Sequence, residues 1–225
     1  MVINSFQPAT ALGDVSDPVQ LVQLSIGATA ALLDHLQHHT ISRLLYTSSA
    51  AVYGDSVECR ETDRPRAAGL HAGLKVANED LVARIGRHRG FPVTLVRLFN
   101  MYGGDDRFSI ISKIVDAARH GHSLTLINEG NAIRDFVHID DVVRAYTALM
   151  DTEASLDVVN VASGVGVSVK GLLDALAVRG RLVETHSLTR DEIRVSTANV
   201  ERLSRLVDVA SFQRAIDWVV AEVGR

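Results

Sequence analysis

The segment LLYTSSAAVYG at residues 44–54 decides the fold, because an apolar run passes directly into a run of hydroxyl side chains. Residues 44–46 predict a buried parallel strand, and the polar residues after them would lie at its carboxyl end. Open α/β sheets bind their ligands at that end of their strands. The hydroxyl groups of Thr47 and Ser49 are therefore candidates to donate hydrogen bonds to a substrate oxygen.

Strand and helix patterns alternate along the chain. Residues 2–3 predict a short strand, and residues 17–39 predict a helix with Asp17 as its cap and Pro18 in its first turn. Residues 43–48 predict the next strand. This alternation predicts an α/β fold, in which a parallel sheet is covered by helices.

Composition narrows the possible partners. The chain has 225 residues, is 47% hydrophobic and carries a formal net charge of -4, which gives no broad attraction to nucleic acid or an anionic membrane. Cys59 is the only cysteine, so an intrachain disulfide and a cysteine-based metal cluster are excluded. We find no apolar stretch of membrane-spanning length and no secretion signal, so we expect a cytoplasmic protein.

Four further motifs follow in order toward the carboxyl terminus. They are His71-Ala72-Gly73-Leu74-Lys75 with Glu79 after it, Arg97-Leu98-Phe99-Asn100-Met101-Tyr102-Gly103, Gly130-Asn131-Ala132-Ile133-Arg134-Asp135-Phe136-Val137-His138-Ile139-Asp140-Asp141, and Val158-Val159-Asn160-Val161-Ala162-Ser163-Gly164. With residues 44–54, this set resembles the extended short-chain dehydrogenase/reductase superfamily, in its branch of NAD-dependent nucleotide-sugar epimerases and dehydratases. The resemblance covers nearly the whole chain.

The resemblance implies a fold with two parts. It implies a truncated Rossmann-like parallel sheet with covering helices, formed by residues 1–103 and 132–162. Residues 104–131 and 163–225 would form a small C-terminal substrate-binding lobe.

The resemblance also implies catalytic residues. Ser49 or Thr47 would bind the substrate oxygen, and Lys75 would hold the nicotinamide ribose. The family's proton-moving tyrosine is replaced by His71, whose unperturbed pKa is ~6.5 and would be lowered by a nearby ammonium, leaving a neutral base near pH 7. The structural alternative for Lys75 is a solvated lysine or an ion pair with Glu79.

A second implied group would hold the diphosphate of a nucleotide sugar. It comprises Arg97, Asn100 and Arg134, together with Tyr53. A planar guanidinium such as that of Arg134 can bind two oxygens at once. The alternatives are an ion pair of Arg134 with an aspartate of its own motif and an internal bridge for Arg97. Arg190 and Arg194 are weaker additions.

Binding of NAD or NADP is implied by the resemblance only. A dinucleotide site needs a strand, a glycine-rich turn and a helix whose N–H groups face the pyrophosphate. We find no such turn before residues 2–3, which align with the family's fourth strand. We therefore expect the N-terminal half of the fold to be lacking, unless the chain is a fragment, and Lys75 alone would hold only a small part of the cofactor.

Two features predict a homodimer. The loss of three strands would leave a sheet edge that needs covering. The helices at residues 18–39 and 69–89 also carry broad apolar faces, which core packing would explain equally well.

No metal site is expected. His35, His38 and His39 share one helical side, but they suit the end of an amphipathic helix. Asp140 is expected to be a helix cap rather than a ligand.

Three functions remain open. The leading one is proton-transfer chemistry, such as epimerisation, isomerisation or elimination, on a nucleotide sugar or related polyol without a tightly held nicotinamide. The second is an NAD(P)-dependent epimerase or dehydratase whose cofactor site is completed by a partner. The third is a noncatalytic sugar-nucleotide-binding or assembly subunit, favoured by His71, by Leu74 at the family's serine and by Ser25 at its asparagine.

Overall fold

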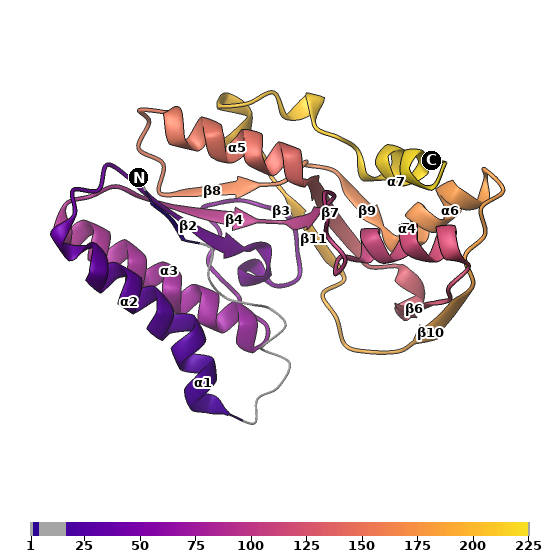
Figure 1. The fold of residues 1–225 in the computed structure, drawn as a ribbon, viewed down its shortest axis with the longest axis horizontal. Helices are drawn as coiled ribbons and strands as arrows, with labels where there is room; N and C mark the ends of the chain where they lie inside the picture. Colours follow the sequence, from indigo (N-terminus) through magenta and orange to yellow (C-terminus); the bar gives the residue numbers. More distant parts are fainter. Residues whose placement is uncertain (1, 5–16, 225) are drawn as a thin grey trace. The chain divides into compact units, whose positions relative to one another are not determined.

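The computed structural model describes residues 2–4 and 17–224, and contacts divide the chain into two compact units (Figure 1). The first unit comprises Met1–Gly54, Glu61–Leu98 and Met150–Asn160, and the second comprises Asp55–Arg60, Phe99–Leu149 and Val161–Arg225. Residues 132–149, which the sequence analysis placed with the sheet of the first part, thus have most of their contacts in the second unit.

The first unit is built on a four-stranded sheet with the strand order β1-β2-β4-β8. Its strands are β1 (Val2–Asn4), β2 (Leu44–Ser49), β4 (Val93–Leu98) and β8 (Val158–Val161). β2 lies parallel to both β1 and β4, as the alternating pattern predicted. The register of β2 and β4 places Ser48 opposite Arg97.

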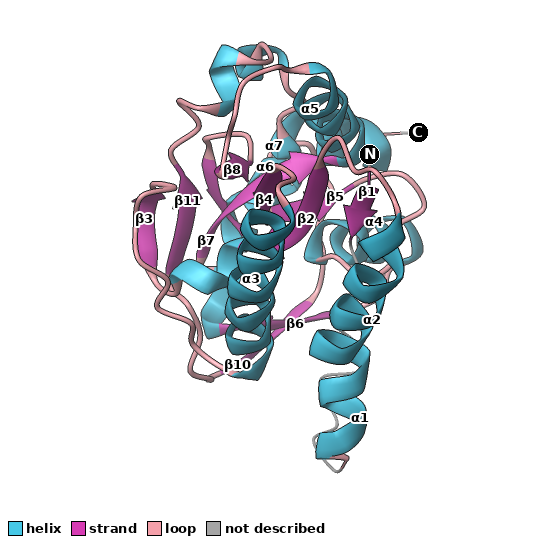
Figure 2. Ribbon diagram, turned by 90° about the vertical axis from the view of Figure 1, so that its left-hand side faces the viewer, coloured by secondary structure: helices cyan, strands magenta, loops and turns pink. Residues whose placement is uncertain are grey.

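Two helical segments pack side by side in the first unit (Figure 2). One runs through α1 (Pro18–Val22), a π-helical turn (Gln23–Gly27), α2 (Ala28–His35) and a 3-10 turn (Leu36–His38), and the other is α3 (Leu70–Arg89). The Asp17 side chain accepts a hydrogen bond of 2.9 Å from the Gln20 N–H, so the predicted cap is confirmed. Leu33, Leu44, Tyr46, Val82 and Leu95 form the core between helices and sheet.

The expectation that no segment could span a membrane was wrong on length and composition. Residues Pro18–His38 have a mean hydropathy of 1.2 over an 18-residue window, of which 22% is buried. A core helix of a soluble protein meets the same criterion. The Asn78 amide of α3 donates to the Ser25 hydroxyl within this segment at 3.1 Å, so one side of it packs on protein.

The second unit is a mixed assembly of short strands and four helices. The sheet order is β3-β11-β7-β5, with β9 antiparallel to β7, and β6 pairs with β10 separately. The strands are β3 (Ser56–Cys59), β5 (Asn100–Tyr102), β6 (Leu124–Ile127), β7 (Ile133–His138), β9 (Gly166–Ser168), β10 (Thr185–Leu188) and β11 (Val195–Ala198). The helices are α4 (Ile110–His120), α5 (Ile139–Asp151), α6 (Val169–Ala177) and α7 (Ala215–Val223).

Ser168 and Asp140 stand at the starts of two helices of the second unit, and only one of them is a cap. Ser168 caps α6, accepting from the Gly171 N–H at 3.0 Å. Asp140 lies inside the first turn of α5 instead of capping it, because its own N–H donates to His138 Nδ1 at 3.2 Å.

Candidate functional site

Lys75 lies in the second turn of α3 and points its ammonium group at the end of β2. Its side chain is buried, Nζ donates to the Thr47 carbonyl oxygen at 2.8 Å, and Nζ lies 5.2 Å from the centre of the Tyr46 ring. Burial lowers the pKa of Lys75 to about 8, against the opposing charge of Glu79. Lys75 is therefore neither a solvated lysine nor hydrogen-bonded to Glu79.

Glu79 binds two elements of the sheet one helical turn beyond Lys75. Its Oε1 accepts from the Ser48 hydroxyl at 2.5 Å and from Arg97 Nε at 3.0 Å, while Oε2 accepts from Arg97 Nη2 at 2.8 Å. Glu79, Ser48 and Arg97 are all buried. The structure thus gives Arg97 the internal bridge that the sequence analysis held as the alternative to a diphosphate contact.

The Arg97 guanidinium also lies over an aromatic ring. Its Cζ is 4.7 Å from the centre of the Tyr53 ring, and Nη1 is buried with no hydrogen-bond partner in the described part of the chain. The Tyr53 hydroxyl donates to Asn160 Oδ1 at 2.7 Å. Tyr53 therefore packs as a core residue beneath Arg97.

The two predicted hydroxyl residues end β2 and begin the 3-10 turn Ala50–Tyr53. Ser49 is half-buried, and its Oγ accepts from the Ala51 N–H at 3.2 Å. A hydroxyl that accepts in this way keeps its own proton to donate to a ligand. Thr47 is half-buried and offers its backbone oxygen to Lys75.

His71 stands in the first turn of α3, one turn before Lys75. Its Nδ1 is buried and has no hydrogen-bond partner among residues 2–4 and 17–224. Burial, and then the charge of Lys75, lower the pKa of His71. The direction matches the one inferred from the spacing, so the imidazole is neutral near pH 7.

The other predicted substrate ligands belong to the second unit and make internal contacts. Asn100 donates to the Asp135 carbonyl oxygen at 3.1 Å. Arg134 donates to the Ile133 carbonyl oxygen at 3.0 Å and pairs with Glu192 at 3.3 Å, not with an aspartate of its own motif. Burial lowers the pKa of Arg134, against the charges of Glu192 and Asp55.

Arg190 and Arg194 are exposed. Arg194 Nε pairs with Asp55 Oδ2 at 3.2 Å. The Arg190 backbone is hydrogen-bonded in both directions with the Asn128 side chain.

Asp135 has a structural role that its sequence neighbourhood did not reveal. Its fully buried carboxylate accepts from the Ser163 N–H at 2.8 Å, the Ser163 hydroxyl at 2.7 Å, the Gly164 N–H at 2.9 Å and the Ala198 N–H at 3.3 Å. Burial raises the pKa of Asp135 to about 6, against these hydrogen bonds. One carboxylate thereby joins β7 to β11 and to the loop after β8.

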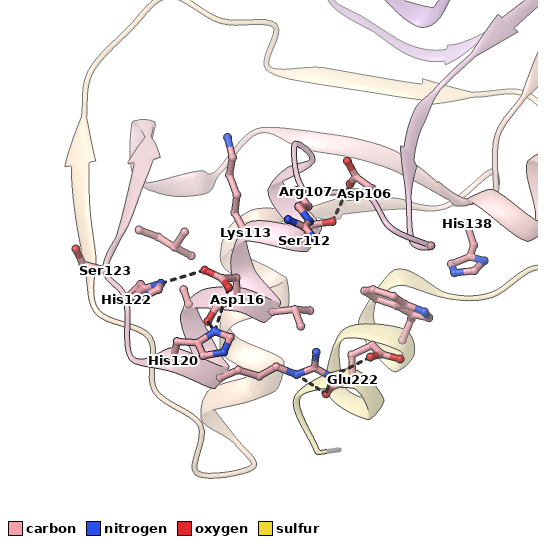
Figure 3. Close-up of a pocket in the computed structure, with 16 residues that line it drawn as sticks. Asp106, Arg107, Ser112, Lys113, Asp116, His120, His122, Ser123, His138 and Glu222 are labelled. Atoms are coloured by element: carbon pink, nitrogen blue, oxygen red, sulfur yellow. Dashed lines mark hydrogen bonds and ion pairs between the residues drawn. The ribbon is translucent and has the colours of Figure 1, made fainter. Parts of the chain in front are cut away.

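A pocket of about 940 Å³ opens beside α4 and α7, and none of the predicted site residues lines it (Figure 3). Its carboxylates are already satisfied: Asp116 lies 3.0 Å from both His120 Nδ1 and His122 Nδ1, and Glu222 pairs with Arg119 at 2.9 Å.

The described residues fit part of a nicotinamide site. The Lys75 ammonium has two N–H groups beyond the one on Thr47 to offer to ribose hydroxyls. In the part of the chain that the structure describes, no strand leads through a turn with three glycines into a helix. A bound nicotinamide would supply and take back a hydride, and Lys75 is the residue here that would hold its ribose.

The fold and the α3 site together define an α/β protein with a parallel sheet and a buried lysine at a strand end. The model of the NAD dependent epimerase/dehydratase family matches residues 1–162. The chain therefore belongs to this family.

Individual relatives agree with the family match. Protein CapI of Staphylococcus aureus is 27% identical over 161 residues, which cover 69% of this chain and 48% of CapI. GDP-6-deoxy-D-mannose reductase of Pseudomonas aeruginosa is 31% identical over 172 residues, covering 72% of this chain and 57% of the reductase. The chain thus spans about half the length of these curated relatives.

A solved structure agrees in fold. UDP-glucuronic acid 4-epimerase from Bacillus cereus, solved in complex with UDP-glucuronic acid and NAD, superposes with a TM-score of 0.87 at 21% identity, covering 96% of this chain and 71% of that one. The α/β fold is therefore confirmed over nearly the whole chain. The predicted loss of an N-terminal half stays a prediction.

Proposed function

We propose that the chain acts on a nucleotide sugar or a related polyol by proton transfer, in an epimerisation, isomerisation or elimination. His71, as a neutral base, would take a proton from a sugar carbon that stands beside a carbonyl group. The imidazolium would return this proton to carbon in an epimerisation or isomerisation, or would give it to a departing hydroxyl group, which leaves as water, in an elimination. Lys75 and Ser49 would donate hydrogen bonds to the substrate oxygen on which negative charge develops. In the second unit, considered by itself, Asn100 and Arg134 would contact diphosphate oxygens of a nucleotide, as the resemblance implies.

The observation that carries this proposal is the pairing of His71 and Lys75 on one face of α3. The imidazole has a buried Nδ1 without a hydrogen-bond partner among the residues that the structure describes, and the ammonium one turn later is buried with its pKa lowered to about 8. Groups whose pKa values are shifted by burial and by a neighbouring charge cluster at functional sites. Family membership supplies the substrate class, since relatives include a GDP-6-deoxy-D-mannose reductase and a putative UDP-glucose 4-epimerase.

A panel of UDP-, GDP- and dTDP-sugars, run with NAD and NADP as separate arms, tests the proposal. We expect a nucleotide sugar to raise the melting temperature and to be converted to a product visible by mass spectrometry. Lys75→Met should abolish conversion, whereas Lys113→Met, which replaces an exposed lysine on α4, should not. Full conversion by the Lys75→Met variant would exclude the assignment.

A second candidate is the redox cycle of the family, in which a partner polypeptide completes the NAD(P) site. The family match and the two free N–H groups of Lys75 favour it. It predicts that NAD or NADP is needed for conversion. Sugar binding without any product under all these conditions would instead support a noncatalytic binding subunit.

We also propose a cytoplasmic homodimer that forms through the first helical segment. Val19, Val22 and Leu24 are 63%, 51% and 41% exposed on this segment, which gives it apolar side chains that a partner could cover. A second copy of the same face is a partner of matching chemistry.

A further inference from the structure

Glu79 and Arg97 form a buried ion pair one helical turn beyond Lys75. Glu79 follows Lys75 by one helical turn, so the two side chains leave the same face of α3. Lys75 contacts Thr47, and Glu79 contacts Ser48, the next residue of β2. Two successive turns of the helix are therefore attached to two successive residues of the strand end.

Glu79 also attaches the neighbouring strand. Arg97 of β4 stands opposite Ser48 in the sheet register, and its Nε and Nη2 both donate to the Glu79 carboxylate. A bidentate guanidinium–carboxylate pair fixes orientation as well as distance. The carboxylate thus joins α3, β2 and β4 within a few ångströms of the Lys75 turn.

We propose that Glu79 is a positioning residue, whose carboxylate holds the end of β2 against α3 so that Lys75 keeps its ammonium on the Thr47 carbonyl. The negative charge of Glu79 also favours the protonated form of Lys75, against its burial. This inference rests on the proposed function only where it gives Lys75 a part in catalysis, because the position of Lys75 can be tested without any substrate.

The pKa of Lys75 can be measured directly, because the sequence contains three lysines, Lys75, Lys113 and Lys170. Lysine labelled with 13C at Cε therefore gives one resonance for Lys75 and two references from exposed side chains. Titrating the full chain yields the pKa of Lys75 without any substrate. We expect the pKa of Lys75 to fall by about one pH unit in Glu79→Gln, since removing an opposite charge at close range disfavours the ammonium.

Matched variants distinguish the effect of the Glu79 carboxylate on Lys75 from that of a neighbouring carboxylate and from unfolding. Asp80→Asn replaces the next carboxylate of α3, which is exposed and paired with Arg84, and should leave the Lys75 titration unchanged. Glu79→Asp keeps the charge and should restore most of the pKa. Because Glu79→Gln leaves Arg97 buried without its partner and can unfold the chain, Glu79→Gln with Arg97→Met removes both charges together. That double variant should show a smaller fall in the same direction.

The two outcomes are distinct. If Lys75 has the same pKa in folded Glu79→Gln, in the double variant and in Asp80→Asn, Glu79 does not influence Lys75 and the inference is overturned. If no nucleotide sugar is ever converted, the proposed function fails while the NMR result for Glu79 still stands. If turnover is found, the limb of its pH profile that depends on Lys75 should move to lower pH in Glu79→Gln.

Discussion

Lys75 is the residue whose environment departs most usefully from that of an ordinary lysine. Lys75 is 5% exposed, and its one described hydrogen bond goes to a carbonyl oxygen and not to a carboxylate. Burial of a charge costs free energy unless a partner compensates for it. The pKa therefore falls from 10.5 to about 8, so the amine is protonated near neutral pH but loses its proton more easily than an ordinary lysine.

The lowered pKa of Lys75 predicts how stability depends on pH. Between about pH 8 and about pH 10.5 the unfolded chain holds a proton at this lysine that the folded chain has lost, so the free energy of unfolding rises with pH in that window. Relative to Lys75→Met, the wild type should gain up to about 3 kcal/mol across it. Urea unfolding of both proteins at pH 7, 8, 9 and 10 measures the difference. A constant difference would contradict the buried ammonium.

At the scale of elements, Gly103 marks a close approach between the end of β5 and the end of β7. Its φ is +94°, and a Cβ there would lie 2.2 Å from Nε2 of the buried His138 ring. The His138 ring cannot retreat without losing its Nδ1 contacts with the Asp140 N–H and the Gln213 amide. Glycine is therefore required by sterics as well as by backbone conformation.

Gly103→Ala should consequently lower the free energy of unfolding by about 2–4 kcal/mol. Gly104→Ala is the control, since its φ is +61° but its nearest neighbour would be 3.4 Å away. It should cost only about 1 kcal/mol. Equal losses in the two variants, measured by thermal or urea unfolding, would show that contact with His138 does not matter.

The sequence predicted local elements well and the pairing of polar groups poorly. The strand after residue 43, the helix with Lys75 and the cap at Asp17 all follow from local patterns of apolar and capping residues. The bond from Ser48 to Glu79 links residues 31 apart, and that from Asp135 to Ala198 links residues 63 apart. No local pattern encodes such partners, so the sequence could not show that Arg97 and Arg134, predicted as ligands, form ion pairs with Glu79 and Glu192.

For the molecule as a whole, the proposed homodimer rests on the exposed apolar face of the first helical segment. Val19 and Val22 stand one helical turn apart on this face and are 63% and 51% exposed, so a second copy of the chain could cover both. We predict that light scattering gives twice the chain mass and that Val19→Glu with Val22→Glu gives the monomer mass. Val178→Glu, at a valine that is 85% exposed on the second unit, should leave the dimer intact. A wild-type monomer at micromolar concentration would refute the prediction.

Turnover in D2O distinguishes proton transfer by His71, with Lys75 as hydrogen-bond donor, from hydride transfer on a nucleotide sugar. Proton transfer at carbon exchanges the substrate hydrogen with solvent, whereas a hydride shuttled through a nicotinamide returns without exchange. We predict that the product formed by wild-type protein gains deuterium at a sugar carbon, and that His71→Ala loses at least about 100-fold in this incorporation. Product that carries no deuterium, or undiminished incorporation by His71→Ala, would contradict it.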